Sequence, residues 1–517
     1  MNKQHAVTIA PMDEYNQELL ANVHPPDWAN PTPCDRYDLV VIGAGTAGLV
    51  TAKGAAGLDI GLKVAAIEKN LMGGDCLNVG CVPSKSIIRS SRVVAEMKHA
   101  LPYGVVPPDN IKVDFPAVMA RMRRVRTKIS PVDSAVAAKK AGVDVFFGEA
   151  SFIGKDAISV NGQTLKFKKA VIAAGARAVR PNIEGLEEVG YLTNENVFSL
   201  TQLPKKLGII GGGPIGCELA QAFNRLGSEV ILFHKGSHLL DKEDPDAAEI
   251  VQRAFIAEGI KLVLNCQLQG VKQSPEGKVI IYRGKEGQES IVVNEILAGA
   301  GRQPNIELNL EAAGVEYDRI KGVKVDDTLQ TTNPKIYGAG DICMNWKFTH
   351  AADAAARIVI KNTLFSPFGL GKSKLSDLIM PWVTYTDPEI AHVGMYEEEA
   401  RAKGIDCNTI KIDFDDVDRA LADGEEGFVK ILHKRGTDKI LGATIVARHG
   451  GEMISEITTA MVGGMGLSKL STVIHPYPTQ AGAIKQAADT YRRTLLTERT
   501  KKLLSFLYTI SRTLTTD

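Results

Sequence analysis

Two cysteines lie close together in a glycine-rich stretch, where they could form a redox-active disulfide. Cys76 and Cys81 are separated by four residues, with Gly73-Gly74 before them and Pro83-Ser84, which can open a helix, after them. A thiolate is the reactive form of cysteine, and the start of a helix lowers the pKa of a thiol. We therefore expect this pair to be catalytic, and the rest of the chain to deliver electrons to it.

The other five cysteines do not form a second pair of this kind. An odd, scattered set of seven does not suit the disulfide framework of a secreted protein. We predict that the remaining five are apolar fillers. They are Cys34, Cys217, Cys266, Cys343 and Cys407.

Length and composition indicate an ordinary globular protein of several domains. A chain of 517 residues is too long for one domain and suggests two to four. A formal net charge of +1 gives no electrostatic reason to expect a nucleic-acid partner. There is no apolar run of spanning length and no basic-then-apolar signal at the N-terminus. A cytoplasmic enzyme is the expected class.

The first glycine motif predicts a dinucleotide site. A buried strand at Asp38–Ile42 leads into Gly43-Ala44-Gly45-Thr46-Ala47-Gly48 and an Ala/Gly-rich helix, and the next strand, Lys63–Ile67, ends on Glu68. Such a unit places a pyrophosphate on the helix N-terminus, while the acid holds the ribose hydroxyls. A tight strand–helix turn is the alternative, but the strand, the helix and the acid all favour a dinucleotide.

A second unit of the same kind begins near residue 205. The strand Leu207–Ile210 is followed by Gly211-Gly212-Gly213-Pro214-Ile215-Gly216, and the strand Glu229–Phe233 ends at His234 and Lys235. An NAD site usually has an acid at that place. Basic residues there favour a 2′-phosphate and therefore NADPH, with NADH as the alternative nucleotide. Both residues could also be plain surface.

Two dinucleotide units in one chain imply that hydride passes from a nicotinamide to a flavin. Further along, the strand and glycine turn of Ile336-Tyr337-Gly338-Ala339-Gly340 end on Asp341. We expect Asp341 to meet the ribityl hydroxyls of the flavin; an N-cap role is the alternative. After a Gly/Ser/Pro/Lys-rich linker at 366–374, the pattern becomes antiparallel α+β, which we interpret as a dimerisation domain.

The two ends of the chain have characters of their own. Residues before Tyr37 are polar and proline-rich, and we predict an extended arm with Trp28 as its aromatic anchor. The tail from Thr494 is basic and amphipathic. We favour a helix packed on its own dimer, with contact to a membrane surface as the alternative. The apolar face holds Leu503, Leu507, Ile510 and Leu514, and Arg499, Lys501, Lys502 and Arg512 lie elsewhere.

Taken together, these motifs resemble the FAD-dependent pyridine nucleotide-disulfide oxidoreductases of class I. The resemblance covers roughly residues 37 to 492, and several further stretches look most like mercuric reductase and its relatives. The motifs that carry it are Gly43 to Gly48, Gly74 to Lys85, Gly211 to Gly216, Gly301-Arg302-Gln303-Pro304-Asn305 and Gly338 to Asp341. The stretches like mercuric reductase are Lys242 to Pro245, Pro381 to Glu389, Val417 to Ala420 and His475 to Thr479.

The resemblance implies an α/β fold with two Rossmann-like dinucleotide-binding domains, one for FAD and one for NAD(P), and a C-terminal α+β dimerisation domain in a homodimer. The predicted boundaries are 1–36 for an N-terminal extension, 37–188 with 310–372 for the FAD domain, 189–309 for the NAD(P) domain, 378–492 for the dimerisation domain and 493–517 for the tail.

The resemblance also implies roles for individual residues. Cys81 is the flavin-side sulfur, Cys76 is the interchange thiol that meets the acceptor, and Lys85 pairs with Glu218 near the flavin N5; a surface ion pair is the alternative for Lys85. No metal site is predicted. Residues predicted to contact FAD or the nicotinamide nucleotide are Gly43, Gly45, Gly48, Glu68, Gly74, Asp75, Cys76, Lys85, Gly175, Gly211, Gly213, Gly216, His234, Lys235, Gly301, Arg302, Gly340 and Asp341.

Two departures from the family leave the electron acceptor open. Tyr477 replaces the histidine that shuttles the thiol proton in dihydrolipoamide dehydrogenases, and Gly482 replaces the glutamate that follows it. Mercuric reductases carry a tyrosine there but end in a cysteine pair, and no cysteine follows Cys407 here. His475 is a candidate proton donor or a hydrogen-bonded interface histidine. Tyr477, with an ordinary pKa around 10, is a poor base but a candidate acid or ligand.

The leading hypothesis is therefore an NADPH-dependent flavoenzyme that passes electrons through Cys76 and Cys81 to a disulfide, a metal ion or another small acceptor. Dihydrolipoamide dehydrogenase is a second hypothesis, and a redox-sensing flavoprotein without steady turnover is a third.

Overall fold

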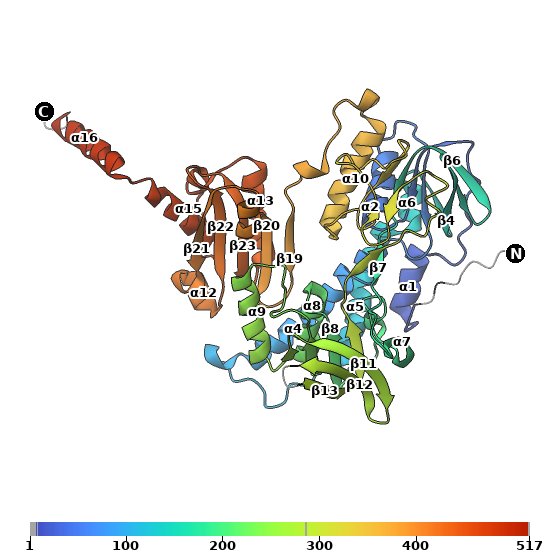
Figure 1. Cartoon of the computed structure of the whole chain (residues 1–517), viewed down its shortest axis with the longest axis horizontal. Helices are drawn as coiled ribbons and strands as arrows, with labels where there is room; N and C mark the ends of the chain where they lie inside the picture. The colour runs from blue at the N-terminus through green and yellow to red at the C-terminus, as the bar shows by residue number, and fades with distance from the viewer. Residues whose placement is uncertain (1–6, 8, 285–286, 515–517) are drawn as a thin grey trace. The chain divides into compact units, whose positions relative to one another are not determined.

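The computed structural model describes residues 7, 9–284 and 287–514. Two compact units make up the chain, the first from Met1–Ser237 with Glu258–Leu378 and the second from His238–Ala257 with Ile379–Asp517. Figure 1 labels their helices and strands. We describe each unit by itself.

The first sheet of unit 1 carries the first glycine motif at its centre. Its strand order is β3-β2-β1-β6-β5-β4, and β18 pairs with β6. The pairs β1·β2, β2·β3, β1·β6 and β18·β6 are parallel, so the carboxyl ends of these strands share one edge. Helix α2 starts at that edge and packs against α10. The bounds are β1 Tyr37–Ile42, α2 Thr46–Ala56, β2 Val64–Glu68, β3 Val143–Phe147, β4 Ala150–Gly154, β5 Ala157–Val160, β6 Gln163–Ile172, β18 Ile336–Gly338 and α10 Thr349–Leu364.

A second parallel sheet in unit 1 carries the second glycine motif. Its order is β10-β9-β8-β14, and all three pairings are parallel. Helix α8 follows β8 through the glycine loop, and the antiparallel sheet β11-β12-β13 precedes β14 in the chain. The bounds are β8 Lys206–Ile210, α8 Pro214–Leu226, β9 Glu229–Phe233, β10 Lys261–Val263, β11 Gln267–Ser274, β12 Gly277–Gly284, β13 Gly287–Val293 and β14 Glu295–Ala298. Both predicted dinucleotide units are confirmed as strand–loop–helix units.

The cysteine segment forms two helices between β2 and β3 of the first sheet. Cys76 lies in α3 (Gly74–Asn78) and Cys81 begins α4 (Cys81–Lys98). Helix α4 packs against α5 (Phe115–Ile129) and against α8, so the cysteine helix and the helix of the second glycine loop are neighbours.

The structure of the N-terminal arm differs from one prediction and agrees with another. Residues 14–23 form helix α1 (Glu14–Val23) instead of an extended arm, because the side chain of Asp13 caps it and Leu19 and Val23 are fully buried. Trp28 is an anchor as predicted, since its Nε1 donates to the carbonyl of Val145 at 3.0 Å.

Unit 2 contains a five-stranded antiparallel sheet with helices α13, α14, α15 and α16 after it in the chain. Its order is β19-β20-β23-β22-β21. Strand β20 is almost wholly buried. Within the described residues, no helix has the length and apolar character needed to cross a bilayer. The bounds are β19 Pro381–Thr384, β20 Glu389–Gly394, β21 Cys407–Asp413, β22 Phe428–Lys434, β23 Ile440–Ala447, α13 Gly450–Val462, α14 Leu467–Leu470, α15 Gly482–Thr494 and α16 Glu498–Leu514.

Candidate active site

The two cysteines are brought within hydrogen-bonding reach by a tight turn between α3 and α4. Gly80 makes this turn, and a Cβ there would lie 2.7 Å from the carbonyl oxygen of Asp75. Cys76 is half-buried and Cys81 is exposed, and their sulfurs share a hydrogen bond. Cys81 is the first residue of an 18-residue helix, where unpaired N–H groups favour negative charge.

The two thiols differ strongly in acidity. The pKa of Cys81 is lowered to about 6, first by the hydrogen bond from Cys76 and then, against the opposing effect of burial, by the hydrogen bond with Thr349 and the charge of Lys85. The Oγ1 of Thr349 lies 3.3 Å from the Sγ of Cys81. The pKa of Cys76 is raised, first because of its hydrogen bond with Cys81 and then by burial. At neutral pH the reduced pair therefore holds a thiolate on Cys81 and a proton on Cys76.

Lys85 and Glu218 join the cysteine helix to the second dinucleotide unit. Lys85 lies one helical turn after Cys81, and its Nζ is 2.8 Å from Oε2 of Glu218 on α8. The side chain of Glu218 is only 8% exposed and that of Lys85 is 36% exposed, so this is not the plain surface pair of the alternative. The positive charge of Lys85 also lowers the pKa of Cys81.

The acidity of Cys81 gives a titration that can be measured. In the reduced protein we expect the Cys81 thiolate to form with a midpoint near pH 6 and to be lost below it, because protonation removes the charge that Cys76 and Lys85 stabilise. Lys85→Met should raise this midpoint, because it removes a stabilising cation. Thiolate ultraviolet absorbance, read as the difference from a Cys81→Ser variant, measures both. A wild-type midpoint near the ordinary cysteine value would contradict the expectation.

The first glycine loop has the shape that a pyrophosphate needs. A Cβ at Gly43 would lie 2.4 Å from the carbonyl oxygen of Ala173, and one at Gly48 would lie 1.8 Å from that of Gly43. Close approach of the backbone therefore requires these two glycines. A Cβ at Gly45 would meet only the Cα of Gly74, at an ordinary 3.6 Å. The chain itself does not require Gly45, which fits a loop whose middle glycine makes room for a bound phosphate.

Glu68 is placed to complete this first site. Its carboxylate accepts the N–H of Ala44 at 2.7 Å and that of Asn70 at 2.8 Å. Burial raises the pKa of Glu68. A carboxylate has about four acceptor positions, so capacity remains for the ribose hydroxyls of FAD. These residues fit the adenosine end of FAD.

The second glycine loop also has two glycines at close backbone approaches, and it has more free space at its middle glycine, Gly213. A Cβ at Gly211 would lie 2.5 Å from the carbonyl oxygen of Gly299, and one at Gly216 would lie 1.9 Å from that of Gly211. Nothing lies within 4 Å of a Cβ at Gly213. The N-terminus of α8 and the space over Gly213 fit a second dinucleotide.

This difference between glycines predicts two kinds of variant. Gly213 has φ −82°, which any residue adopts, so Gly213→Ala should keep the melting temperature but weaken NADPH binding by about tenfold or more. Gly216→Ala, as the contrasting variant, should lower the melting temperature, because its methyl would overlap the backbone. Thermal melts and NADPH titrations measure both effects. Unchanged NADPH affinity in Gly213→Ala would argue against a dinucleotide over this loop.

His234 takes the place in the second site that Glu68 has in the first. Its Nδ1 accepts the N–H of Gly212 at 3.1 Å, just as Glu68 accepts that of Ala44. His234 is buried and Lys235 is exposed. The side chain that meets the loop is therefore an imidazole instead of a carboxylate.

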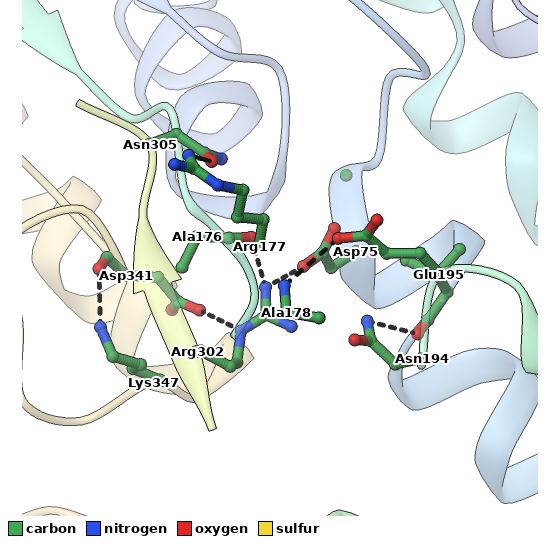
Figure 2. A network of polar contacts seen from close by, with 12 residues as sticks. Asp75, Ala176, Arg177, Ala178, Asn194, Glu195, Arg302, Asn305, Asp341 and Lys347 are labelled. Atoms are coloured by element: carbon green, nitrogen blue, oxygen red, sulfur yellow. Dashed lines mark hydrogen bonds and ion pairs between the residues drawn. The ribbon is translucent and has the colours of Figure 1, made fainter. Parts of the chain in front are cut away.

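Arg302 connects the cysteine segment to the turn that carries Asp341 (Figure 2). Its guanidinium donates to Asp75, which precedes Cys76, and to the carbonyl of Ala176 at 2.6 Å, and its Nε lies 3.4 Å from Oδ2 of Asp341. Burial raises the pKa of Asp341. Asp341 is not the N-cap of α10, which is Phe348, so the alternative N-cap role is wrong.

The remaining predicted glycines stand at sharp backbone turns around this network. Gly175 follows β6, Gly301 precedes Arg302, and Gly340 precedes Asp341. Their φ values are +67°, +110° and +79°, and Gly74 at the start of α3 has +57°. Such angles favour glycine, and they let the chain turn beside the charged network.

The two candidate proton donors belong to unit 2, whereas the cysteine pair belongs to unit 1. His475 Nε2 lies 2.7 Å from Oε1 of Glu456. Tyr477 is 82% exposed, and its hydroxyl donates to Oδ2 of Asp418 at 2.9 Å. That hydrogen bond raises the pKa of Tyr477. The partner of His475 is therefore Glu456, and residue 482, where the family has a glutamate, is a glycine.

Two residues near the cysteines were not anticipated. Thr349, the first residue of α10, contacts Cys81 from 268 positions away in sequence. Asp133 raises the pKa of Cys76 by its charge, and burial raises its own pKa. No local pattern in the sequence pointed to either residue.

The five remaining cysteines behave as structural residues. Cys217 and Cys266 are buried, and burial raises the pKa of both. Burial raises the pKa of Cys343 to about 12. Over the described part of the chain, no group of three or more His, Cys, Asp or Glu side chains could hold a metal ion.

Two dinucleotide units and a redox cysteine pair define a class of disulfide oxidoreductases, and comparison with known families agrees. The family described as pyridine nucleotide-disulphide oxidoreductase matches residues 37–356, and the dimerisation domain of that family matches residues 380–488. The chain belongs to the pyridine nucleotide-disulphide oxidoreductase family. It is an oxidoreductase that uses FAD and NAD(P)H, and its dimerisation domain supports a homodimer.

Relatives with different activities match over most of the chain. A mercuric reductase of Lysinibacillus sphaericus is 35% identical over 459 residues, which cover 88% of this chain and 83% of that protein. A dihydrolipoyl dehydrogenase of Thermus scotoductus is 34% identical over 466 residues, covering 88% and 97%. Among solved structures, the HOCl-induced flavoprotein disulfide reductase RclA from Escherichia coli has a TM-score of 0.77 and 28% identity, covering 88% and 99%.

Proposed function

We propose that this protein is an NADPH-dependent reductase that passes electrons through Cys76 and Cys81 to a small disulfide. The observation that carries this proposal is the acidity of the pair, a thiolate on Cys81 beside a protonated thiol on Cys76. Lys85, Glu218 and Thr349 surround Cys81, which suits the sulfur on the cofactor side. That leaves Cys76 as the sulfur that exchanges with the acceptor.

The chemistry of the pair balances as two-electron transfer. When bound, FAD supplies the two-electron exchange between NADPH and the cysteines. Cys76 attacks one sulfur of the acceptor disulfide, whose S–S bond breaks, and the proton that Cys76 loses goes to the first thiol as it leaves. The Cys81 thiolate then attacks the sulfur of Cys76. This re-forms the Cys76–Cys81 disulfide and releases the second sulfur as a thiolate, which takes up a proton from solvent.

The departing thiols need protons, and we assign this task to the loop that contains His475 and Tyr477. Tyr477 is exposed and carries a proton at neutral pH, since its pKa is raised. His475 is held by Glu456. Either side chain could act as a general acid toward the acceptor.

Tyr477→Phe tests this assignment. We expect acceptor turnover to fall by at least about a hundredfold, the lower end for general acid catalysis. NADPH should still reduce the flavin at the wild-type rate, because that step precedes the thiol exchange. Stopped-flow absorbance separates the two rates, and Tyr508→Phe, at another exposed tyrosine, is the matched control. If both rates are unchanged in Tyr477→Phe, this residue is not catalytic.

A metal ion is the second candidate acceptor, because mercuric reductases are among the relatives and a Cu(II) complex of RclA is known. Two thiolates are soft ligands for such ions. The lack of a cysteine after Cys407 argues against a second thiol pair that collects the metal.

Oxidation of dihydrolipoamide is the third candidate reaction, in which this dithiol donates electrons through the cysteine pair and NAD accepts them. Dihydrolipoyl dehydrogenases are also among the relatives. Tyr477 and Gly482, in place of the usual histidine and glutamate, argue against it.

An acceptor panel decides among these candidates. The reduced enzyme is mixed with glutathione disulfide, lipoamide, Cu(II), Hg(II) and quinones, and its reoxidation is followed. Fastest turnover with glutathione disulfide supports the proposal, whereas faster oxidation of dihydrolipoamide with NAD than reduction of any acceptor by NADPH would overturn it in favour of a dihydrolipoamide dehydrogenase. Fastest turnover with a metal ion overturns it in favour of metal reduction, and reversible reduction without turnover on any acceptor indicates a redox sensor.

We also propose NADPH as the preferred nucleotide and the cytoplasm as the compartment. An imidazole at His234, where the first site has a carboxylate, removes the group that would repel a 2′-phosphate. A reducing compartment keeps a thiol pair available for turnover.

A further inference from the structure

The last helix of unit 2 exposes an apolar face. In α16 every described side chain from Lys501 to Thr513 is exposed, and the apolar ones are 40% to 68% exposed. They include Leu503, Phe506, Leu507 and Ile510, which recur at the spacing of a single helix face. We call these four residues the α16 apolar face.

The helix before it shows what a covered face looks like in the same unit. In α15 the residues Ala483, Ile484, Ala487, Ala488 and Tyr491 recur at similar spacing and are all buried, at 7% exposure or less. They belong to the core of unit 2, whereas none of the described side chains of α16, up to Thr513, does. The chain therefore covers the apolar face of α15 but leaves that of α16 open.

The charges of α16 are strongly one-sided. The helix contains Arg499, Lys501, Lys502 and Arg512 but a single acid, Glu498. Lys501 pairs with Glu498 at 2.8 Å, and both side chains are largely exposed, so this ion pair is weak. A bulky apolar face on a cationic helix is typical of helices that lie in the headgroup region of an anionic membrane.

We propose that α16 binds the protein to the surface of a membrane that contains anionic lipids. The helix would lie in the plane of the bilayer, with the α16 apolar face at the acyl boundary and its lysines and arginines among the headgroups. Its 17 residues span about 25 Å, less than the hydrocarbon core, and its charges exclude a spanning orientation. The cytoplasmic leaflet carries such anionic lipids.

Charge favours lipid over a second copy of this chain as the occupant. If two α16 helices packed face to face, eight cations would meet only two acids. Protein helices that pair usually balance such charges across their flanks. An anionic bilayer supplies the opposite sign along the whole helix.

Co-sedimentation with vesicles tests this proposal on the full-length, FAD-loaded protein. We expect binding to vesicles of phosphatidylcholine with phosphatidylglycerol, weaker binding to phosphatidylcholine alone, and weakening by salt. Leu503→Gln with Leu507→Gln should reduce the affinity by at least about tenfold, because both substitutions remove apolar area from the buried face. Lys502→Gln should reduce affinity for the anionic vesicles by about fivefold and leave the neutral vesicles unaffected.

Ser505→Gln is the matched control, since it makes the same kind of side chain on the opposite side of the helix. It should bind as wild type does. Flavin content and melting temperature should be unchanged in all variants, because the replaced side chains are exposed. The proposal is overturned if the wild type does not bind anionic vesicles, or if the double variant binds as tightly. It is also overturned if the double variant dissociates the dimer in sedimentation velocity, which would assign the face to a second copy.

Discussion

Cys81→Ser should lower turnover with any disulfide acceptor by at least about a thousandfold. Serine cannot form the Cys76–Cys81 disulfide, so the electrons taken from NADPH have no route to Cys76. NADPH should still reduce the bound flavin, because the second glycine loop and His234 are untouched. A long-wavelength absorbance band on two-electron reduction of the wild type reports the thiolate beside the flavin, and it should be missing from Cys81→Ser.

The two cysteines should also differ from one another. Cys76→Ser removes the thiol that donates to Cys81 but leaves the Cys81 sulfur beside Thr349 and Lys85. We expect it to lose turnover as well and to keep the long-wavelength band at high enough pH. Cys407→Ser, far along the chain in β21, is the control and should behave as wild type. A band that survives in Cys81→Ser but disappears in Cys76→Ser would reverse the two roles.

The glycine loops and the cysteine pair were predictable because local chemistry dictates them. At Gly48 and Gly216 a Cβ would lie less than 2 Å from a backbone oxygen, so only glycine fits and the requirement is visible in the sequence itself. The same holds for Asn161-Gly162, because an Asn-Gly pair is typical of a hairpin turn and the two residues have φ +47° and +80° between β5 and β6.

Contacts between distant segments were less predictable. The pKa of Cys81 depends on Thr349, and that of Cys76 depends on Asp133, residues that no local pattern links to the cysteines. The helix α1 was missed because its surroundings are rich in proline, although Asp13 is a good N-cap and Arg126 holds Asn16 at 2.6 Å. Contacts between segments far apart in the chain determine these features, and a single sequence does not reveal such contacts.

For His234, the structure adds a specific hydrogen bond to a prediction that was made from the sequence. The sequence offered two basic residues, His234 and Lys235, in place of an acid. The structure separates them, since His234 accepts the loop N–H of Gly212 while Lys235 is exposed. From the parallel with Ala44 and Glu68, we expect residue 234 to be the position that selects the nucleotide.

His234→Glu should therefore shift the preference from NADPH toward NADH by about a hundredfold in kcat/KM. A glutamate at residue 234 would accept the N–H of Gly212, as Glu68 accepts that of Ala44, so the loop should keep its shape. Its carboxylate would also accept the ribose hydroxyls of NADH and repel the 2′-phosphate of NADPH. A gain on one nucleotide and a loss on the other, each worth about 1.4 kcal/mol, together give the hundredfold shift.

Steady-state rates with both nucleotides, and their dissociation constants measured by titration, report this shift. His99→Glu makes the same substitution at an exposed position after α4 and should leave the preference unchanged. Lys235→Gln should lower the affinity for NADPH only if the lysine also reaches the 2′-phosphate, so it separates the contributions of the two basic residues. A wild type that prefers NADH, or a His234→Glu variant that keeps the NADPH preference, would show that residue 234 does not select the nucleotide.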